Sequence, residues 1–149
     1  NAYFKNLTKQ HQPKKRRIKM SFLDLNVNDV PDLIALPEGE EYQLRILECE
    51  IKTSSKGNQG IQCRFDVPSE PNSKDITHWI GIPDASADEK KRNSALRRIR
   101  DFCTCFGIST AGGIDLSDVQ GRTGWANLAI ENDDTYGEQN RIKRFITGH

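Results

Sequence analysis

Few side chains in this chain have the types and spacing that catalysis requires. No serine lies in a Gly-x-Ser-x-Gly turn, and no Gly-x-x-x-x-Gly-Lys-Ser/Thr loop is present to hold a phosphate. His78 shares the apolar parity of its predicted strand, which favours a core or rim histidine over a catalytic one. Cys103 and Cys105 lack the second pair or the spaced histidines of a zinc site. We therefore predict no catalytic residue, no bound metal and no cofactor.

Acidic side chains offer the remaining route to catalysis. Asp133 and Asp134 could hold a metal, but acidic pairs in turns are usually just solvated. A small metal-dependent nuclease built on Asp66, Asp75 or Asp133 is a secondary alternative. Product released from a single-stranded substrate with Mg²⁺ or Mn²⁺ would favour that alternative.

Aromatic residues interleaved with Arg and Lys point instead to binding. Proteins bind single-stranded nucleic acid with rings that stack on bases, at about 1–3 kcal/mol per base, and with cations that meet the phosphates. The predicted stacking rings are Trp79, Tyr136 and Phe145. The predicted phosphate contacts are Lys56, Arg64, Arg141 and Lys143, with Gln62 and Thr77 between them.

The order in which hydrophobic periodicity changes along the chain predicts how these residues are positioned. Three period-2 stretches lie between residues 42 and 82, and one period-3.6 stretch covers residues 87–106. Two more strand-like runs follow at 121–131 and 141–147. Three strands, a helix and two strands form the element order of the OB-fold, a five-stranded Greek-key barrel that commonly binds oligonucleotides. We therefore predict an all-β fold with one helix, and specifically an OB-fold.

The OB-fold predicts one binding surface for the candidate residues. Its ligand crosses the outer face of the second and third strands, between the loop joining strands one and two and the loop joining strands four and five. Trp79 has a structural alternative, as a plug for the open end of the barrel. In the last strand, Ile142 and Ile146 are predicted to face the core, so Phe145 falls on the opposite side with Lys143.

Local patterns predict further details. The apolar alternation of the first strand slips by one residue between Ile46 and Cys49, which predicts a β-bulge. Ser86 and Glu89 form a capping box for the helix, and Gly107 ends it. The buried stripe of this helix is predicted to contain Leu96, Ile99, Phe102, Cys103 and Phe106. Its solvated face, away from the ligand, is predicted to contain Lys90, Lys91, Arg97 and Arg98.

The formal charge of +1 conceals an asymmetry along the chain. Seven of the 22 Lys and Arg residues lie in residues 1–19, which hold no acid. Residues 20–149 therefore carry 15 basic residues against all 21 acids, a net charge of −6. A negative body disfavours partners bound by bulk charge, so binding to nucleic acid requires basic residues gathered on one face.

Residues 1–19 show no hydrophobic period and end in a basic run just before Met20, the only methionine. One interpretation is a basic disordered arm for nucleic acid, or a nuclear-localisation-like patch. We favour another. Arg16 and Arg17 can be encoded AGG-AGG, a ribosome-binding sequence, two codons before the ATG of Met20. Residues 1–19 are then translated leader, and residues 20–147 are the OB-fold domain.

Length and composition limit the protein class. A chain of 149 residues has room for one domain with one core. No apolar run approaches the length that spans a bilayer, and the N-terminus lacks a secretory segment, which predicts a cytoplasmic protein with no membrane partner. Four irregularly spaced cysteines favour free thiols over a disulfide framework.

Several stretches carry a resemblance to a known family. They are residues 21–25 (SFLDL), 36–42 (LPEGEEY), 97–99 with 102–103, and, most specifically, 121–125 (GRTGW) with 136–142 (YGEQNRI). Through them, residues 20–147 resemble the single-stranded-DNA-binding-like proteins of bacteriophage replication modules. The resemblance implies an OB-fold protein that coats exposed single strands in the bacterial host cytoplasm, with Asn140 and Arg141 near the DNA backbone. Unlike many such binders, this sequence shows no acidic tail before Gly148 and His149.

Together these patterns predict a protein that binds single-stranded DNA with little sequence preference during phage replication or recombination. Phage or host replication and recombination proteins are its further expected partners. The alternative is an OB-fold interaction module that docks a helicase, recombinase or nuclease and touches DNA weakly or not at all. The net charge of −6 on residues 20–149 favours this alternative. The sequence leaves the oligomeric state open.

Overall fold

The computed structural model describes residues 20–149, so the predicted leader at 1–19 lies outside the described residues. Residues 20–31 contain no helix or strand, and in their turn Asn26 Nδ2 donates to Asp29 Oδ2 over 2.7 Å. Within residues 20–149, none of the helical structure combines the length and the apolar character that a bilayer crossing needs.

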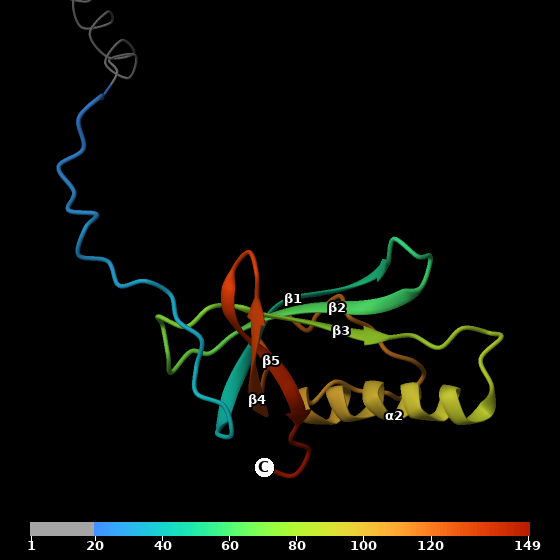
Figure 1. The fold of residues 1–149 in the computed structure, drawn as a ribbon. Coiled ribbons are helices and arrows are strands. Elements are labelled where there is room, and N and C mark those ends of the chain that lie inside the picture. The colour runs from blue at the N-terminus through green and yellow to red at the C-terminus, as the bar shows by residue number, and fades with distance from the viewer. Residues whose placement is uncertain (1–19) are drawn as a thin grey trace, which may run out of the picture. The chain divides into compact units, whose positions relative to one another are not determined.

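Residues 32–149 contain one five-stranded antiparallel sheet and one helix (Figure 1). The elements are β1 (Glu41–Thr53), β2 (Gln59–Asp66), β3 (Ile76–Gly81), α2 (Glu89–Phe106), β4 (Thr123–Asp133) and β5 (Gly137–Phe145). The strand order in the sheet is β3-β2-β1-β4-β5. In Figure 1 the β4–β5 hairpin runs across the direction of β2 and β3. The predicted mostly-β class and the predicted order of elements are confirmed.

The long strand β1 lies at the centre of the sheet because it pairs on both sides. Its first part, Glu41 to Arg45, pairs with β4, and the part from Arg45 onward pairs with β2. Between these parts, Ile46 lies opposite Phe65 and Glu48 opposite Arg64, which leaves one extra residue in β1. The predicted β-bulge is therefore confirmed. A bulge bends its strand, so β1 can serve two partners that run in different directions.

The outer strands β3 and β5 approach each other along a line that we call the seam. No backbone pairing joins them in the described sheet, so hydrogen bonds do not close it. Side chains bridge the seam instead. Lys74 Nζ, just before β3, donates to the carbonyl oxygens of Tyr136 (3.0 Å) and Glu138 (2.7 Å) at the start of β5. Further along, the rings of His78 and Phe145 meet edge to face, with centroids 5.3 Å apart.

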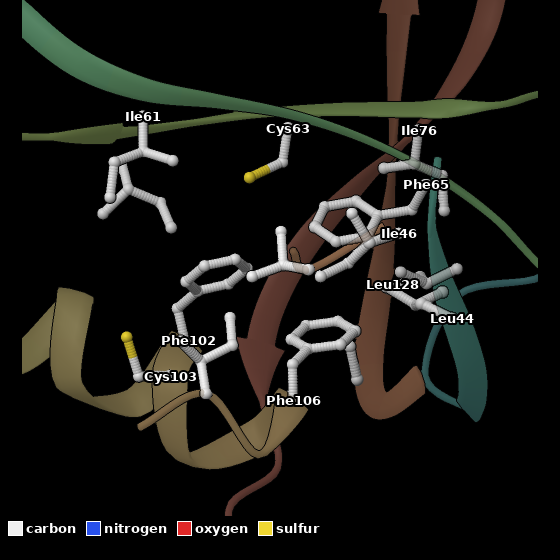
Figure 2. Packing of buried hydrophobic residues seen from close by; sticks show 14 of the residues in the cluster. Leu44, Ile46, Ile61, Cys63, Phe65, Ile76, Phe102, Cys103, Phe106 and Leu128 are labelled. Atoms are coloured by element: carbon white, nitrogen blue, oxygen red, sulfur yellow. The ribbon is translucent and has the colours of Figure 1, made fainter. Parts of the chain in front are cut away.

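The core lies between the sheet and α2. Figure 2 shows Phe102, Cys103 and Phe106 of the helix pointing toward apolar side chains of the strands. Phe106 stacks on Phe65 of β2, with centroids 5.4 Å apart. The predicted helical stripe is buried except at Leu96, which is 43% exposed. Apolar packing of one helical face therefore fixes α2 against the sheet.

The two ends of α2 differ in how well the sequence predicted them. Asp88 caps the first turn, where its carboxylate accepts a hydrogen bond from the Lys91 backbone N–H at 2.8 Å. The predicted Ser86–Glu89 capping box was wrong, because Glu89 is already the first helical residue. Gly107 ends the helix as predicted, in the left-handed conformation (φ 68°) that glycine adopts without a steric penalty.

A second β-bulge changes the orientation of residues near the end of β5. Leu128 lies opposite Ile142 and Asn127 opposite Arg144, so Lys143 is the extra residue. Beyond the bulge, Phe145 lies opposite the buried Ala126 and faces the core. The prediction that Phe145 shares an outer face with Lys143 was therefore wrong, because the bulge shifts the alternation by one residue.

Candidate nucleic-acid interface

Four of the predicted interface residues share the outer face of β2 and β3. The register pairs Gln62 with Trp79 and Arg64 with Thr77, and these positions alternate with the buried residues of both strands. The neighbouring outer positions of β1 are acidic, since Glu50 lies opposite Gln62 and Glu48 lies opposite Arg64. The outer face therefore combines one large ring with charges of both signs.

The indole of Trp79 lies across the backbone of β2 at Gly60. A Cβ atom added to Gly60 would clash with Trp79 Cε2, so only glycine leaves room for this ring. Trp79 remains 39% exposed in this position. The structure thus holds a large aromatic surface at the outside of the sheet and keeps part of it open to solvent.

Two predicted phosphate contacts are already bound to carboxylates. Arg64 donates to Asp75 Oδ2 at 2.8 Å and lies 3.5 Å from Glu48 Oε2. Arg141 donates to Glu131 Oε1 at 2.9 Å and thereby lowers the pKa of that carboxyl group. Because each guanidinium group already has a carboxylate partner, part of its charge is neutralised within the protein before any phosphate arrives.

Asn140 has a structural role that differs from the one the family resemblance implied. Its side chain is 3% exposed and lies beside the backbone of residues far away in the sequence. Asn140 Oδ1 accepts from Leu36 N at 2.7 Å, and Nδ2 donates to Leu36 O at 2.9 Å and to Ala129 O at 3.3 Å. Because its polar atoms are all engaged inside the protein, we remove Asn140 from the set of DNA contacts.

Two further predicted residues are exposed in hairpin loops. Tyr136 is 71% exposed in the β4–β5 loop, at the opposite end of β5 from Phe145. Lys56 is exposed in the β1–β2 loop, between residues that hold the turn through a hydrogen bond from Ser54 to Asn58. Both side chains are free to meet a ligand, but they lie at different ends of the sheet.

A cleft of about 580 Å³ opens where α2 passes the far end of the seam. We call it the seam cleft. It is lined by His78, Trp79, Ile80, Gly81, Arg98, Asp101, Ile142, Lys143, Arg144 and Phe145. Among residues 20–149, no ion pair engages Arg98, Lys143 or Arg144, whereas Asp101 lies 3.9 Å from Arg100. The cleft therefore combines an apolar wall with three uncommitted cations, that is, basic side chains that form no ion pair within residues 20–149.

The seam cleft contains two cations that sequence reasoning missed. Arg98 was predicted to lie on a solvated face away from the ligand, yet it borders the cleft. Arg144 was not singled out, because its position depends on the bulge at Lys143. One signal was available for Arg144: strict alternation would have placed it on the core face between Ile142 and Ile146, where an unpaired charge is unfavourable.

A second depression of about 640 Å³ adjoins the seam cleft. We call it the hairpin groove. It is lined by Thr53, Gly57, Asn58, Gln59, Trp79, Gly81, Ile82, Pro83, Asp84 and Ala85. Trp79 and Gly81 line both depressions, so Trp79 stands where they meet. A chain-like ligand could pass from one to the other over this ring.

His78 contributes an apolar surface to the seam cleft. Burial, and secondarily the positive charge of Arg141, lowers the pKa of this imidazole below its ordinary value. The ring is consequently neutral at pH 7, and it packs edge to face on Phe145. The prediction of a rim histidine agrees with this half-buried position.

The acids considered for a nuclease lie in separate contacts. Asp66 accepts from Arg45 Nε at 3.0 Å, and Asp75 binds Arg64. Asp133 accepts from the backbone N–H groups of Thr135 and Tyr136 in the β4–β5 turn. In the part of the chain that the structure describes, no group of three or more His, Cys, Asp or Glu side chains is placed to hold a metal ion.

Comparison with known proteins supplies no relative for this site. Neither a scan against models of protein families nor a search of curated proteins finds a match for the chain. The resemblance to phage single-stranded-DNA-binding-like proteins therefore continues to rest on the sequence stretches quoted above.

Proposed function

We propose that this protein is an OB-fold protein that binds single-stranded DNA with little sequence preference. The DNA would follow a track from the seam cleft, over Trp79, into the hairpin groove. The observation that carries the proposal is the exposed ring of Trp79, at the junction of two depressions, one of which is bordered by three uncommitted cations.

The strand order supports the OB-fold assignment. A central β1 pairs with both β2 and β4, and a helix connects β3 to β4. The outer strands β3 and β5 run in the same direction along the seam, since their beginnings meet at Lys74 and their ends border the seam cleft. A partly open five-stranded barrel is built in this way. We infer that the seam is its incomplete closure.

The chemistry of the track suits an unpaired strand. Every base has a flat face that can stack on an indole, whatever its sequence, and each phosphate needs a cation. Trp79 offers the ring, and Arg98, Lys143 and Arg144 offer charges that no carboxylate of residues 20–149 pairs with. Lys56 extends this track, because its loop borders the hairpin groove. Tyr136 is a second stacking candidate at the other end of the seam, and Phe145 forms part of the cleft wall.

The biological setting is part of the same proposal. A role in phage DNA replication or recombination, in the cytoplasm of a bacterial host, is supported by the sequence resemblance alone. Such a role would expose the protein to transient single strands, for which sequence-tolerant binding is appropriate.

Fluorescence anisotropy of a labelled oligo-dT, with the matching duplex as a reference, tests the proposal on the full chain. We expect binding to the single strand that weakens steeply with salt. Trp79→Ala should weaken it about 5- to 150-fold, the equivalent of one lost stacking contact of about 1–3 kcal/mol. Leu96→Ala is a matched control, because Leu96 is similarly exposed but borders a different depression.

Two further variants separate stacking from simple loss of bulk. Trp125→Phe leaves Trp79 as the single tryptophan, so quenching of its fluorescence by oligo-dT reports stacking directly. Gly60→Ala retains Trp79 but forces its ring to move, and should weaken binding nearly as much as Trp79→Ala. Unchanged affinity in both Trp79→Ala and Gly60→Ala would overturn the proposed track.

The interaction-module alternative is favoured by the excess of acids and by the internal neutralisation of Arg64 and Arg141. A comparison of the full chain with residues 20–149 separates the two functions. Binding that survives removal of residues 1–19 supports the track. Binding that disappears with them would assign the affinity to the basic segment and favour the interaction module.

A further inference from the structure

Two cysteines face each other across the β1–β2 pair. Cys49 and Cys63 are direct partners in the strand register, and their Sγ atoms lie 2.9 Å apart. Directly opposite residues in antiparallel strands have Cα atoms about 4.5–5.5 Å apart. A disulfide spans about 4.4–6.8 Å between Cα atoms. The two sulfurs can therefore be joined without moving either strand.

The two thiols differ in access and in chemistry. Cys63 is fully buried in the core, whereas Cys49 is partly exposed. The hydrogen bond between the two sulfurs lowers the pKa of Cys49, and the same bond together with burial raises the pKa of Cys63. An oxidant from solvent therefore reacts first with Cys49. The buried Cys63 thiol can then act as the resolving thiol, which reacts with the oxidised Cys49.

The other two cysteines lack this combination. Cys103 is 1% exposed on the buried face of α2. Cys105 donates its thiol proton to Trp125 O at 3.2 Å, and burial raises the pKa of Cys105 to about 11. Neither is a strand partner of another cysteine. Among the four free cysteines, only the β1–β2 pair is both aligned and reachable.

We propose that Cys49 and Cys63 are a reversible oxidation site that forms a cross-strand disulfide with peroxide. The Cys49 thiolate attacks one oxygen of hydrogen peroxide, the O–O bond breaks, and the departing hydroxide takes a proton to become water. The resulting Cys49 sulfenic acid is attacked by the Cys63 sulfur, the S–O bond breaks, and a second water leaves with the Cys63 proton. Two thiols are thereby oxidised to one disulfide as one peroxide is reduced to two waters.

This bond would link β1 covalently to β2, the strand on which the ring of Trp79 lies over Gly60. It would enclose the β1–β2 turn in a covalent loop, which stabilises a fold chiefly by restricting the unfolded chain. The oxidised protein should therefore unfold at a temperature higher by about 5 °C or more. The proposal does not depend on DNA binding, and its failure would leave the proposed function intact.

Peptide mapping of the full chain tests the proposal. The protein is treated with hydrogen peroxide, its remaining thiols are alkylated, and it is digested with trypsin without reductant. Cleavage at Lys52 and Lys56 separates the two cysteines, so the disulfide appears as residues 46–52 linked to residues 57–64. We expect this linked pair, with the intact mass lower by two hydrogens, and we expect dithiothreitol to abolish it.

Two variants make the assignment specific. Cys103→Ser should form the same linked peptides, whereas Cys49→Ser should form none and should lose the rise in unfolding temperature. If Cys49→Ser fails to fold, the map of the unaltered chain still decides the matter. Four alkylated thiols after peroxide treatment, or a bond between any other pair of cysteines, would overturn the proposal.

Discussion

The two ends of the seam between β3 and β5 differ in whether their polar side chains have partners inside the protein. At the beginning of both strands, Lys74 binds the carbonyl oxygens of Tyr136 and Glu138, and Asn140 binds the backbone of Leu36. The side chains of Lys74 and Asn140 thus find their partners inside the protein. This end is closed by hydrogen bonds, even though the strands themselves do not pair.

At the other end, three basic side chains have no such partners within residues 20–149. Arg98, Lys143 and Arg144 border an apolar cleft, and none of them is in an ion pair within residues 20–149. Trp79 stays partly exposed beside them. Exposure and charge alone therefore do not identify a binding surface. Arg64 and Arg141 have both, but carboxylates of the same protein already hold them.

Asn140→Ala is expected to give the largest effect, at the closed end. It removes three hydrogen bonds and leaves the buried backbone of Leu36 without partners, so the free energy of unfolding should fall by about 3–4 kcal/mol. Urea unfolding measures this loss. Gln139→Ala, at a half-exposed neighbour, should cost far less. Weaker DNA binding by a fully folded Asn140→Ala protein would contradict the structural role.

Paired charge removals at the open end should have the next largest effect. Arg98→Gln with Lys143→Gln should weaken binding to oligo-dT about 25-fold at 0.1 M salt and flatten the salt dependence by about 1.4 in slope. Arg64→Gln with Arg141→Gln removes the same charge from residues that are already paired. We expect a smaller change in that variant. An equal or larger one would move the track to the face of β2 and β5.

A pH titration of stability at His78, in the wall of the seam cleft, should show the smallest effect. Burial lowers the pKa of folded His78, so the unfolded chain binds its proton more readily. The free energy of unfolding should therefore fall as the pH decreases from about 6.5, the ordinary histidine value, through the folded pKa. Urea unfolding between pH 5 and 8 measures this slope. The slope should diminish in His78→Gln, and an identical slope there would assign it to other groups.

Local sequence patterns predicted most of the fold. The strands and helix follow from hydrophobic periodicity, and the first bulge follows from the slip between Ile46 and Cys49. The second bulge was not predicted, because Phe145 and Ile146 are both apolar and either one satisfies a simple alternation. One residue of difference there decided whether Phe145 faced the core or the ligand.

The candidate site was harder to predict, because its contacts join distant parts of the chain. Asn140 meets Leu36, more than a hundred residues earlier, and no local pattern marks a buried asparagine. The place of Arg98 depends on how α2 packs beside β5, which periodicity does not determine. Trp79 and Lys143, which line the seam cleft, could be proposed from the sequence because their strands were predictable and their residue types suit a single-stranded ligand.

The double pairing of β1 has a consequence for the order of folding during synthesis. The end of β1 can form its hairpin with β2 as soon as both leave the ribosome. Its beginning must wait for β4, since Arg45 pairs with Thr123 across most of the domain. Such distant pairing slows folding, so the sheet should complete in milliseconds to seconds, well after its hairpins form. Until then, Glu41–Arg45 remains an open strand edge that a chaperone or a neighbouring nascent chain could bind.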